Sequence, residues 1–420
     1  MAKTTFRATV VIGEALAPVG ELVFEADGRR QTSMFRYADA WLDNPAGYAI
    51  APAMPLSTTP FFTSATAENS RAALPLPVGD GTPDSWGRGL MRRGERRSLT
   101  EFDYLVGVDD RTRQGALRYL DAEGRPLAHS WPPVPRITEL EDLRRLASTP
   151  IENLDAASRS RLIGSGASVG GARPKGCVVD ADGALAIAKF TTYQDTAPIE
   201  RVEVATLRLA ADVGIDAAAA RLELGNTDRP VAIIKRFDRR SAARSRPADR
   251  VPYLSAQSFI GAALATGGFY TDIADALRTH AASPKTQLAE LFRRILFSIL
   301  VSNNDDHLRN HGLLHVGGGL WMLSPAFDIN PQPERTRHLE TGISELSGHQ
   351  ASIEAALEAA PFFDIDHDQA RSMLGSMVDL IAGRWRQRCR ETGLSAAETT
   401  RYARAFDHEE TKIARRLARV

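Results

Sequence analysis

The chain has 420 residues, 43% of them hydrophobic, and its 52 lysines and arginines balance 52 aspartates and glutamates. A formal net charge of zero argues against a dedicated nucleic-acid binder, which normally carries a strongly basic face. The two cysteines, Cys177 and Cys389, lie too far apart in sequence for a metal motif or a disulfide framework. The sequence has no apolar signal core and no uncharged apolar run of about 18 residues, so we expect a soluble, cytoplasmic protein without a membrane span.

The first part of the chain predicts a small α/β subdomain. Residues 5–35 alternate apolar and polar side chains in places, which is typical of short strands. Prolines punctuate the stretch that follows, where we expect mostly loop, and helices are expected near residues 86–93 and 99–106. Residues 126–135 contain four prolines and indicate a boundary. We therefore assign residues 1–130 to an N-terminal subdomain.

Residues 131–240 predict a β-rich part. Strand-like runs at residues 176–179 and 184–190 follow a glycine-rich stretch. A helix with apolar residues at helical spacing then ends at Gly214, and another strand is expected at residues 230–237. The order is strand, strand, helix, strand.

Residues 241–420 predict a helical part. The helix Leu288–Val301 is apolar on most faces, so we expect it to be buried. Charged helices are expected at residues 367–393 and 396–419. A β-rich lobe followed by a helical lobe predicts an α+β, two-lobed enzyme with polar loops at the junction.

The strongest chemical signal is the polar segment Asn303–Gly312, directly after the buried helix. Side chains this polar at the end of a buried helix must be solvated, hydrogen-bonded or bound to an ion. Asp305 and Asn310 are five residues apart, which is the spacing of the base and the metal-binding asparagine in the catalytic loop of protein kinases. The alternative interpretation is a polar helix cap and turn. The density of polar residues and their position favour the catalytic loop.

Two other residues suit phosphoryl transfer. Asp328 follows the apolar segment Gly319–Leu323 in a proline-marked turn and could be a second Mg²⁺ ligand, the alternative being an ordinary turn aspartate. Lys189 closes an apolar strand and would suit an ion pair with nucleotide phosphates, oriented by Glu203 on the following helix. The alternative is a strand-end lysine that reaches solvent.

Other motifs are weaker. The glycine-rich segment Gly164–Ala172 could bring backbone N–H groups close to phosphates, but it has neither the P-loop nor the dinucleotide-binding pattern, and a flexible loop is the alternative. His307 and His311 are four residues apart, but the His-Glu-x-x-His motif is absent, which disfavours a zinc site. Serine-hydrolase chemistry lacks the Gly-x-Ser-x-Gly elbow.

Taken together, these segments resemble the HipA family, the kinase toxins of bacterial HipBA toxin–antitoxin modules, over nearly the whole chain. The matching segments are the phosphate loop Ser168–Lys175, the lysine strand Ile187–Phe190, the helix Glu203–Ile215, the hinge Lys235–Arg239, the catalytic loop Asn303–Gly312, the metal-binding turn Ser324–Asp328, and the N-terminal segments Leu76–Arg88 and Gln114–Leu117. Two positions depart from the family pattern. The phosphate loop ends in Ala-Arg-Pro-Lys instead of Ala-Gln-Glu-Lys, and Lys235 stands where an acidic residue is frequent.

The resemblance implies a protein-kinase-like fold with an extra N-terminal α/β subdomain and an all-helical C-terminal lobe. It implies ATP and Mg²⁺ as cofactors, with Asp305 as the base, Asn310 and Asp328 as Mg²⁺ ligands, and Glu203 as the ion-pair partner of Lys189. Arg309 would be either an arginine finger or a structural partner of Asp306. The implied ATP-binding residues are Ser168, Val169, Gly170, Gly171, Lys189, Lys235, Phe237, His307, Asn310 and Asp328.

The resemblance also implies a reaction, a switch and partners. The chain would phosphorylate a protein serine or threonine, with an aminoacyl-tRNA synthetase such as glutamyl-tRNA synthetase as the typical target. Autophosphorylation of Ser168, or of the nearby Ser165, would add about −2 of charge to a loop that holds phosphate and so repel ATP. A HipB-like DNA-binding antitoxin would be the partner, and DNA would be contacted only through it.

Two other functions remain open on the sequence. A small-molecule kinase of the aminoglycoside or choline type shares the lobes and the Asp-x-x-x-x-Asn loop, but it does not need the region before residue 150. A non-catalytic co-repressor would be expected to have lost some of the four catalytic residues, and all four are present: Lys189, Asp305, Asn310 and Asp328.

Overall fold

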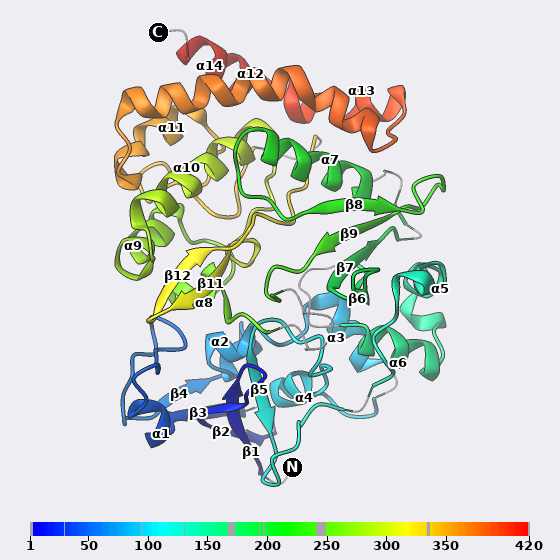
Figure 1. Ribbon diagram of the computed structural model, residues 1–420, viewed down its shortest axis with the longest axis vertical. Helices are drawn as coiled ribbons and strands as arrows, with labels where there is room; N and C mark the ends of the chain where they lie inside the picture. Colours follow the sequence, from blue (N-terminus) through cyan, green and yellow to red (C-terminus); the bar gives the residue numbers. More distant parts are fainter. Residues whose placement is uncertain are drawn as a thin grey trace. The chain divides into compact units, whose positions relative to one another are not determined.

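The computed structural model describes residues 3–28, 30–93, 95–129, 131–166, 173–192, 194–195, 197, 199–240, 249–333 and 337–418. The chain forms two compact units, shown together in Figure 1. Unit 1 contains residues 1–193, 235–254 and 314–319, and unit 2 contains residues 194–234, 255–313 and 320–420. The three ranges expected from the sequence divide the chain differently and stay a prediction. The phosphate-loop residues Ser168, Val169, Gly170 and Gly171 lie outside the described residues.

Unit 1 begins with a five-stranded antiparallel sheet, as the alternating pattern of residues 5–35 predicts. The strand order is β4-β3-β2-β1-β5 (Figure 1). The strands are β1 (Thr4–Ile12), β2 (Ala17–Asp27), β3 (Arg30–Tyr37), β4 (Phe61–Ser64) and β5 (Leu117–Leu120). Phe6 pairs with Phe24 across β1 and β2, and the ring of Phe102 stacks 4.7 Å from that of Phe6. An aromatic cluster therefore closes one face of this sheet against the helix that carries Phe102.

Short helices and a hairpin complete unit 1. The helices expected near residues 86–93 and 99–106 are confirmed as α3 and α4. The hairpin pairs Lys175 with Lys189 at its open end. The helices are α1 (Asp39–Leu42), η1 (Ser70–Ala73), α2 (Leu76–Gly79), α3 (Ser85–Arg92), α4 (Glu101–Val106), η2 (Ile137–Glu139), α5 (Leu140–Ala147), η3 (Ile151–Asn153) and α6 (Ala156–Gly164), and the hairpin strands are β6 (Lys175–Val179) and β7 (Leu185–Phe190).

Unit 2 is mostly helical. The predicted buried helix is α10, and the side chains along its second half are almost fully buried. The described part of residues 241–420 is not purely helical as expected, because it contains the short strands β10 (Tyr253–Ser255), β11 (Gly312–Gly317) and β12 (Leu320–Leu323), and residues 253–254 and 314–317 of these strands belong to unit 1. The helices and the hairpin are α7 (Ile199–Asp212), β8 (Ala220–Glu223), β9 (Val231–Lys235), α8 (Ala256–Ile260), α9 (Tyr270–His280), α10 (Pro284–Leu300), η4 (Leu308–Asn310), α11 (Ile353–Glu358), η5 (Ala360–Phe363), α12 (His367–Glu391), α13 (Ala396–Phe406) and α14 (Glu409–Leu417).

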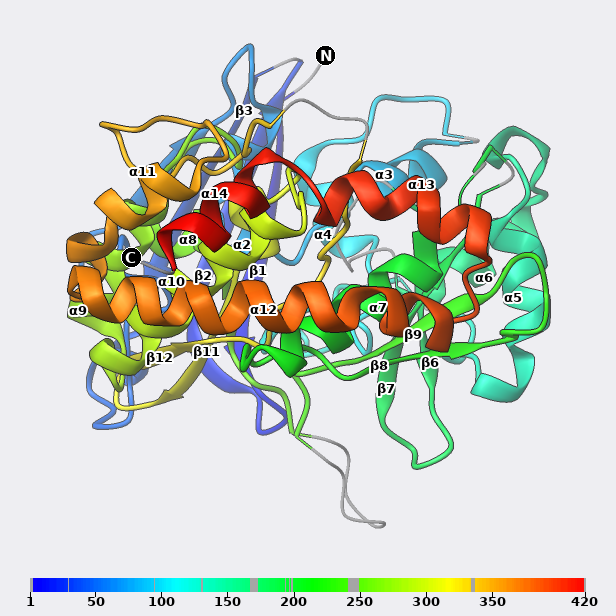
Figure 2. The same cartoon turned by 90° about the horizontal axis from the view of Figure 1, so that it is seen from above.

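The long helix α12 packs against α7 and α14 (Figure 2). Asp212, at the end of α7, accepts hydrogen bonds from Arg384 and Arg388 of α12. The single helix expected at residues 396–419 is wrong, because the chain breaks into α13 and α14 at His408. The His408 ring accepts a hydrogen bond from the backbone N–H of Thr411 and so caps the N-terminus of α14. Among the described helices, none combines the length and apolar composition that spanning a membrane requires.

Candidate active site

The polar loop starts where α10 ends in a left-handed turn. Ser302 has a φ of 55°, and the backbone N–H of Asn303 donates to the Ser298 carbonyl over 2.9 Å. This pattern is a Schellman motif, usually built on glycine. Here a serine adopts the conformation, and its hydroxyl donates to the Ala405 carbonyl over 3.0 Å. The chain therefore leaves the buried helix in a direction that tertiary contacts fix.

Asp306 is the buried anchor of the loop. Its carboxylate accepts hydrogen bonds from the hydroxyl groups of Tyr270 and Ser298 and lies 3.0 Å from Nε2 of His311. Burial by itself raises the pKa of this carboxyl, but the His311 ring and the hydroxyl donors outweigh burial and hold the pKa below its usual value. With these partners around it, Asp306 holds the loop together.

Asp305, the neighbouring residue, is exposed. Its backbone carbonyl accepts a hydrogen bond of 2.8 Å from the side-chain nitrogen of Asn310. The two residues of the Asp-x-x-x-x-Asn pattern are therefore in direct contact within one loop. Because the amide nitrogen of Asn310 is used in this bond, its amide oxygen points elsewhere and can act as a ligand. The 3₁₀ turn η4 is fixed in turn by the bond from the Leu308 N–H to the Ala265 carbonyl.

Asp328 lies on a second segment that is tied to the same loop. Its φ of 57° is uncommon for a residue other than glycine and costs free energy that its surroundings must offset. Asn330 makes both connections: its side-chain nitrogen donates to Oδ1 of Asp328 over 2.8 Å, and its backbone N–H donates to Oδ1 of Asn303 over 3.0 Å. Asn330 thereby connects the predicted metal-binding turn to the predicted catalytic loop.

Buried Arg294 of α10 anchors the chain segment that precedes Asp328. Its guanidinium donates to the Ser324 carbonyl over 2.8 Å and pairs with Glu290 one turn earlier over 2.9 Å. Beyond Ser324, the Ala326 N–H donates to the Asp216 carbonyl over 2.7 Å. The segment before Asp328 is therefore anchored on both sides.

A small pocket opens where the two segments meet. Asn310 lines it, and so do Phe327 and Ile329, the residues on either side of Asp328. The full lining is Ile215, Arg294, Phe297, Ser298, Asn303, Asp306, Asn310, His311, Ala326, Phe327 and Ile329. Three of the predicted site residues, Asp305, Asn310 and Asp328, are thus brought to one place in unit 2.

The donor set at this place fits Mg²⁺. Mg²⁺ prefers oxygen ligands and is commonly held by one or two side chains together with substrate phosphates. Asn310 offers an amide oxygen, and Asp328 offers a carboxylate, of which Oδ1 accepts a hydrogen bond from Asn330. Across the described ranges, no three His, Cys, Asp or Glu side chains gather into a group that could hold a metal ion. A two-residue site completed by phosphate oxygens does not need such a group.

Lys189 lies in unit 1 at the open end of the β6–β7 hairpin, half-buried. Directly opposite it stands Lys175, which is 4% exposed. Like charges opposite each other on a sheet are destabilising unless an anion lies near them. From the sequence, Lys189 is proposed as a partner of nucleotide phosphates, and Lys175 is not considered for this role. The alternating pattern of the two strands and the short turn between them could have predicted that the two lysines lie opposite each other.

The predicted hinge also lies in unit 1. Lys235 is exposed, whereas Phe237 is half-buried with its ring 6.2 Å from that of Tyr253. Between them, the backbone N–H of Arg236 donates to the Leu185 carbonyl over 3.3 Å. This bond ties the main chain between Lys235 and Phe237 to β7.

The remaining predicted residues occupy different environments. Glu203 lies on α7 of unit 2 and is 3% exposed. Nδ1 of His307 is buried, and within the described ranges no hydrogen-bond partner reaches it. Ser165, the competitor of Ser168 for modification, is 1% exposed, and its hydroxyl donates to the Leu162 carbonyl over 2.8 Å.

Comparison with known protein families gives two matches. The model of the HipA-like C-terminal domain matches residues 167–385. The model of the HipA N-terminal domain matches residues 9–120. The second match covers the region that distinguishes a HipA-like chain from a small-molecule kinase.

Relatives and solved structures agree with these matches. The chain is 26% identical over 317 residues to the predicted kinase Y4mE of Sinorhizobium fredii, covering 70% of this chain and 71% of that protein. A predicted kinase of Haemophilus influenzae is 35% identical over 68 residues, 16% of this chain and 20% of that protein. The Shewanella oneidensis MR-1 HipA structure, solved with HipB and operator DNA, superposes with a TM-score of 0.70 at 16% identity, covering 98% and 96% of the two chains. The expected α+β, kinase-like fold is confirmed.

Proposed function

The chain belongs to the HipA family of kinase toxins, and from this premise we propose that it is a serine/threonine protein kinase that uses ATP and Mg²⁺. One observation carries the proposal. The catalytic loop exposes Asp305 while it buries Asp306, and Asn310 lines the same pocket as Phe327 and Ile329, the two neighbours of Asp328. This is the arrangement that transfer of a phosphoryl group to a hydroxyl requires.

The reaction assigns a role to each residue at this place. The hydroxyl oxygen of the substrate forms a bond to the γ-phosphorus of ATP, the bond from that phosphorus to the bridging oxygen breaks, and ADP leaves. Asp305 accepts the hydroxyl proton. Asn310 and Asp328 would hold Mg²⁺, which when bound neutralises charge on the phosphate oxygens.

The remaining residues would bind and orient ATP. Lys189 would pair with the α- and β-phosphates, with Glu203 as its ion-pair partner. Main-chain groups of Lys235 and Phe237 would bind adenine, and the unpartnered nitrogen of His307 supports a contact between this side chain and the nucleotide. The phosphate loop Ser168, Val169, Gly170 and Gly171 would hold phosphate oxygens through its backbone N–H groups.

We further propose that Ser168 is the site of autophosphorylation. The burial of Ser165 and its bond to the Leu162 carbonyl argue against Ser165 as the acceptor. A phosphate on Ser168 would repel ATP from the loop. Ser168→Ala should therefore abolish self-labelling and leave phosphorylation of other proteins intact. Unchanged self-labelling in this variant would remove the proposal.

A HipB-like antitoxin is the proposed partner, and DNA would be contacted only through it. The similarity to the HipA of a HipA–HipB–operator complex supports this partner. The proposed substrate is an aminoacyl-tRNA synthetase, with glutamyl-tRNA synthetase as the first to test.

The decisive experiment incubates the protein with labelled ATP, Mg²⁺ and a cell lysate. We expect protein bands that are labelled by the wild type, absent with Asp305→Ala, and retained with Asp379→Ala, which removes an exposed aspartate of α12. Phosphoserine or phosphothreonine in those bands would establish the acceptor. Labelled small molecules without labelled protein would favour the small-molecule kinase instead, and no labelling by the wild type would contradict kinase activity.

A further inference from the structure

The side chain of Arg236 connects the predicted hinge to the N-terminal part of unit 1. It is 3% exposed although it is charged. Its guanidinium donates to the carbonyls of Thr112 and Arg113 over 2.6 and 3.2 Å, and to Sγ of Cys177 over 3.3 Å. A buried arginine that reaches main-chain carbonyls more than a hundred residues away fixes the distance between the two segments.

Asp238 completes the connection from the other side. Its carboxylate accepts from Nε of Arg236 over 2.8 Å and from the backbone N–H of Gly115 over 2.8 Å. Its backbone carbonyl accepts from the Val251 N–H over 3.0 Å. Burial by itself raises the pKa of the Asp238 carboxyl, but the guanidinium groups beside it outweigh burial and hold the pKa well below its usual range. The carboxylate is therefore charged at every physiological pH.

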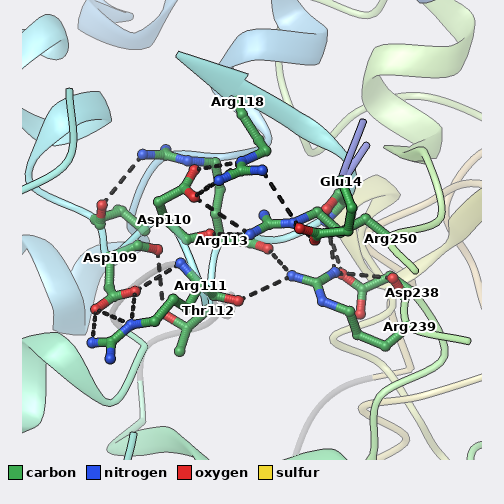
Figure 3. A network of polar contacts seen from close by, with 12 residues as sticks. Glu14, Asp109, Asp110, Arg111, Thr112, Arg113, Arg118, Asp238, Arg239 and Arg250 are labelled. Atoms are coloured by element: carbon green, nitrogen blue, oxygen red, sulfur yellow. Dashed lines mark hydrogen bonds and ion pairs between the residues drawn. The ribbon is translucent and has the colours of Figure 1, made fainter. Parts of the chain in front are cut away.

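Arg239 adds a second tie to the same loop. Its guanidinium donates to the Arg113 carbonyl over 2.6 Å and to the Gly115 carbonyl over 3.2 Å, and it contacts Asp238 over 2.9 Å. Figure 3 shows Arg239 and Asp238 beside Arg113 and Thr112. The predicted hinge Lys235–Arg239 is thus bound to residues 112–115 through both of its arginines.

The loop 109–115 is itself held on the N-terminal sheet. Arg118 of β5 pairs with Asp110 over 2.6 Å (Figure 3). Arg250 pairs with Glu14 over 2.7 Å and donates to the Asp110 carbonyl over 2.7 Å. The left-handed Gly115, with a φ of 73°, lies so close to Tyr253 that a Cβ atom would sit 3.3 Å from that residue's Cβ. The loop therefore has little freedom to move relative to the sheet.

We propose that Arg236 and Asp238 are positioning residues for the nucleotide, through which the N-terminal subdomain fixes the main chain that binds adenine. Arg236 stands between Lys235 and Phe237, so any movement of its backbone moves both. The division into units agrees, because residues 235–254 group with residues 1–193. The proposal rests on the proposed kinase function, and it gives the N-terminal subdomain a part in nucleotide recognition.

The competing interpretation is a buried ion pair that only stabilises the fold. Loss of stability lowers the fraction of folded enzyme and affects every nucleotide equally. A shifted hinge instead weakens recognition of the base, because main-chain hydrogen bonds distinguish adenine from guanine. The ratio of kcat/KM for ATP to that for GTP is therefore the quantity to measure.

The test compares Arg236→Lys with Arg88→Lys. Arg88 makes the same kind of bidentate pair, partly buried, with Glu101 over 2.6 and 2.8 Å, but at a distance in sequence from the hinge and its loop. In Arg236→Lys we expect the KM for ATP to rise about tenfold, the change that follows from losing one hydrogen bond to the base. We expect kcat to stay within about twofold and the ATP-to-GTP ratio to fall about tenfold. Arg88→Lys should keep the wild-type ratio.

A second variant and a second readout keep the proposal testable if Arg236→Lys folds poorly. Arg239→Lys removes the bonds to the Arg113 and Gly115 carbonyls and should lower the ratio in the same direction. Hydrogen exchange without nucleotide should show faster exchange of the Arg236 and Gly115 amides in either variant.

The outcomes separate the two proposals. An unchanged ATP-to-GTP ratio in both variants, with an active wild type, overturns the positioning role alone. Unchanged exchange at the Arg236 and Gly115 amides also overturns it, whether or not the protein is a kinase. A wild type that binds no ATP overturns the proposed function and the nucleotide role with it, even if exchange responds to the variants.

Discussion

Unit 1 and unit 2 each bury an aspartate with a depressed pKa, and the partners of the two carboxylates differ. In unit 2, Asp306 is surrounded by two hydroxyl groups and an imidazole. In unit 1, Asp238 is surrounded by two guanidinium groups and a backbone N–H. The first set fixes a short loop and leaves its neighbour Asp305 exposed. The second set reaches across unit 1 to main-chain carbonyls.

The difference indicates two ways of supporting a reaction. The two hydroxyl groups and the imidazole converge on one carboxylate, so the Asp306 network fixes a single loop. Arginine side chains are long and donate in a planar fork, so the Asp238 network links segments that are distant in sequence and positions main chain. Four predictions test this comparison, in order of expected effect.

The largest effect is expected at the exposed carboxylate. Asp305→Asn removes the group that accepts the proton, so kcat for phosphoryl transfer should fall by about 10²–10⁴. Because the side chain is exposed, the free energy of unfolding should change by less than about 0.5 kcal/mol. Steady-state kinetics and urea denaturation measure the two quantities. A loss of stability that accounts for the loss of activity would contradict the assignment of the base.

The buried neighbour should behave in the opposite way. In Asp306→Asn the amide cannot satisfy both hydroxyl donors and the imidazole, so the free energy of unfolding should fall by about 2–3 kcal/mol. The measurement is urea denaturation, with Asp305→Asn as the matched control one residue away. Equal stability of the two variants would show that the Asp306 network does not hold the loop.

A partly exposed ion pair provides a reference for the size of the stability change expected in Asp306→Asn. Asp212 forms ion pairs with Arg384 and Arg388, and the Arg388 side chain is 25% exposed. Because solvent screens such a pair, Arg388→Ala should lower the free energy of unfolding by only about 1 kcal/mol. Arg390→Ala, at an exposed position of the same helix, is the control. A loss as large as that of Asp306→Asn would mean that the clamp between α7 and α12 contributes more than its exposure suggests.

The smallest expected effect is on the pH dependence of stability. One buried histidine in each unit allows the two units to be compared. Burial lowers the pKa of His408 in unit 2, and that of His315 in unit 1, to about 4. An unfolded histidine titrates near about 6.5, so the unfolded state binds more protons between the two values. The contribution of the two neutral histidines to the free energy of unfolding is therefore fully present above about pH 6.5, and it is lost as the pH falls toward about 4.

Replacing either histidine should flatten this decline. His408→Asn keeps a helix-capping residue at the start of α14, and its stability relative to wild type should improve on acidification by about 1 kcal/mol or less at pH 6. His315→Asn should act in the same direction. Melting temperatures measured from pH 5 to 7 decide the matter, and parallel profiles for wild type and both variants would rule out a contribution from these groups.

Much of the candidate site could be predicted because its signals are local. The Asp305–Asn310 spacing lies within one loop, and the contact between their backbone and side-chain atoms follows from a short turn. The buried helix before it was readable from apolar composition. The spacing predicted Asp305 as the base. The burial of Asp306 depends on Tyr270, which is distant in sequence, and on Ser298, which belongs to no motif.

Other features could not be predicted because they depend on non-local partners. The break between α13 and α14 occurs where His408 caps a helix and its Nε2 contacts the Leu300 carbonyl, 3.1 Å away. The pairing of Lys175 with Lys189 depends on the register of a hairpin. The role of Arg236 depends on carbonyls of residues 112 and 113, which no local pattern connects to it.

The sequence by itself determined which polar loop is the candidate for phosphoryl transfer, the order of strands and helices around it, and the likeness to HipA, since spacing and periodicity are properties of neighbouring residues. Only the tertiary structure decided which of two adjacent aspartates is buried, which lysine stands opposite Lys189, and which arginines tie the hinge to the N-terminal subdomain. The physical reason is that burial and ion pairing depend on what packs against a residue, and that partner is set by the fold.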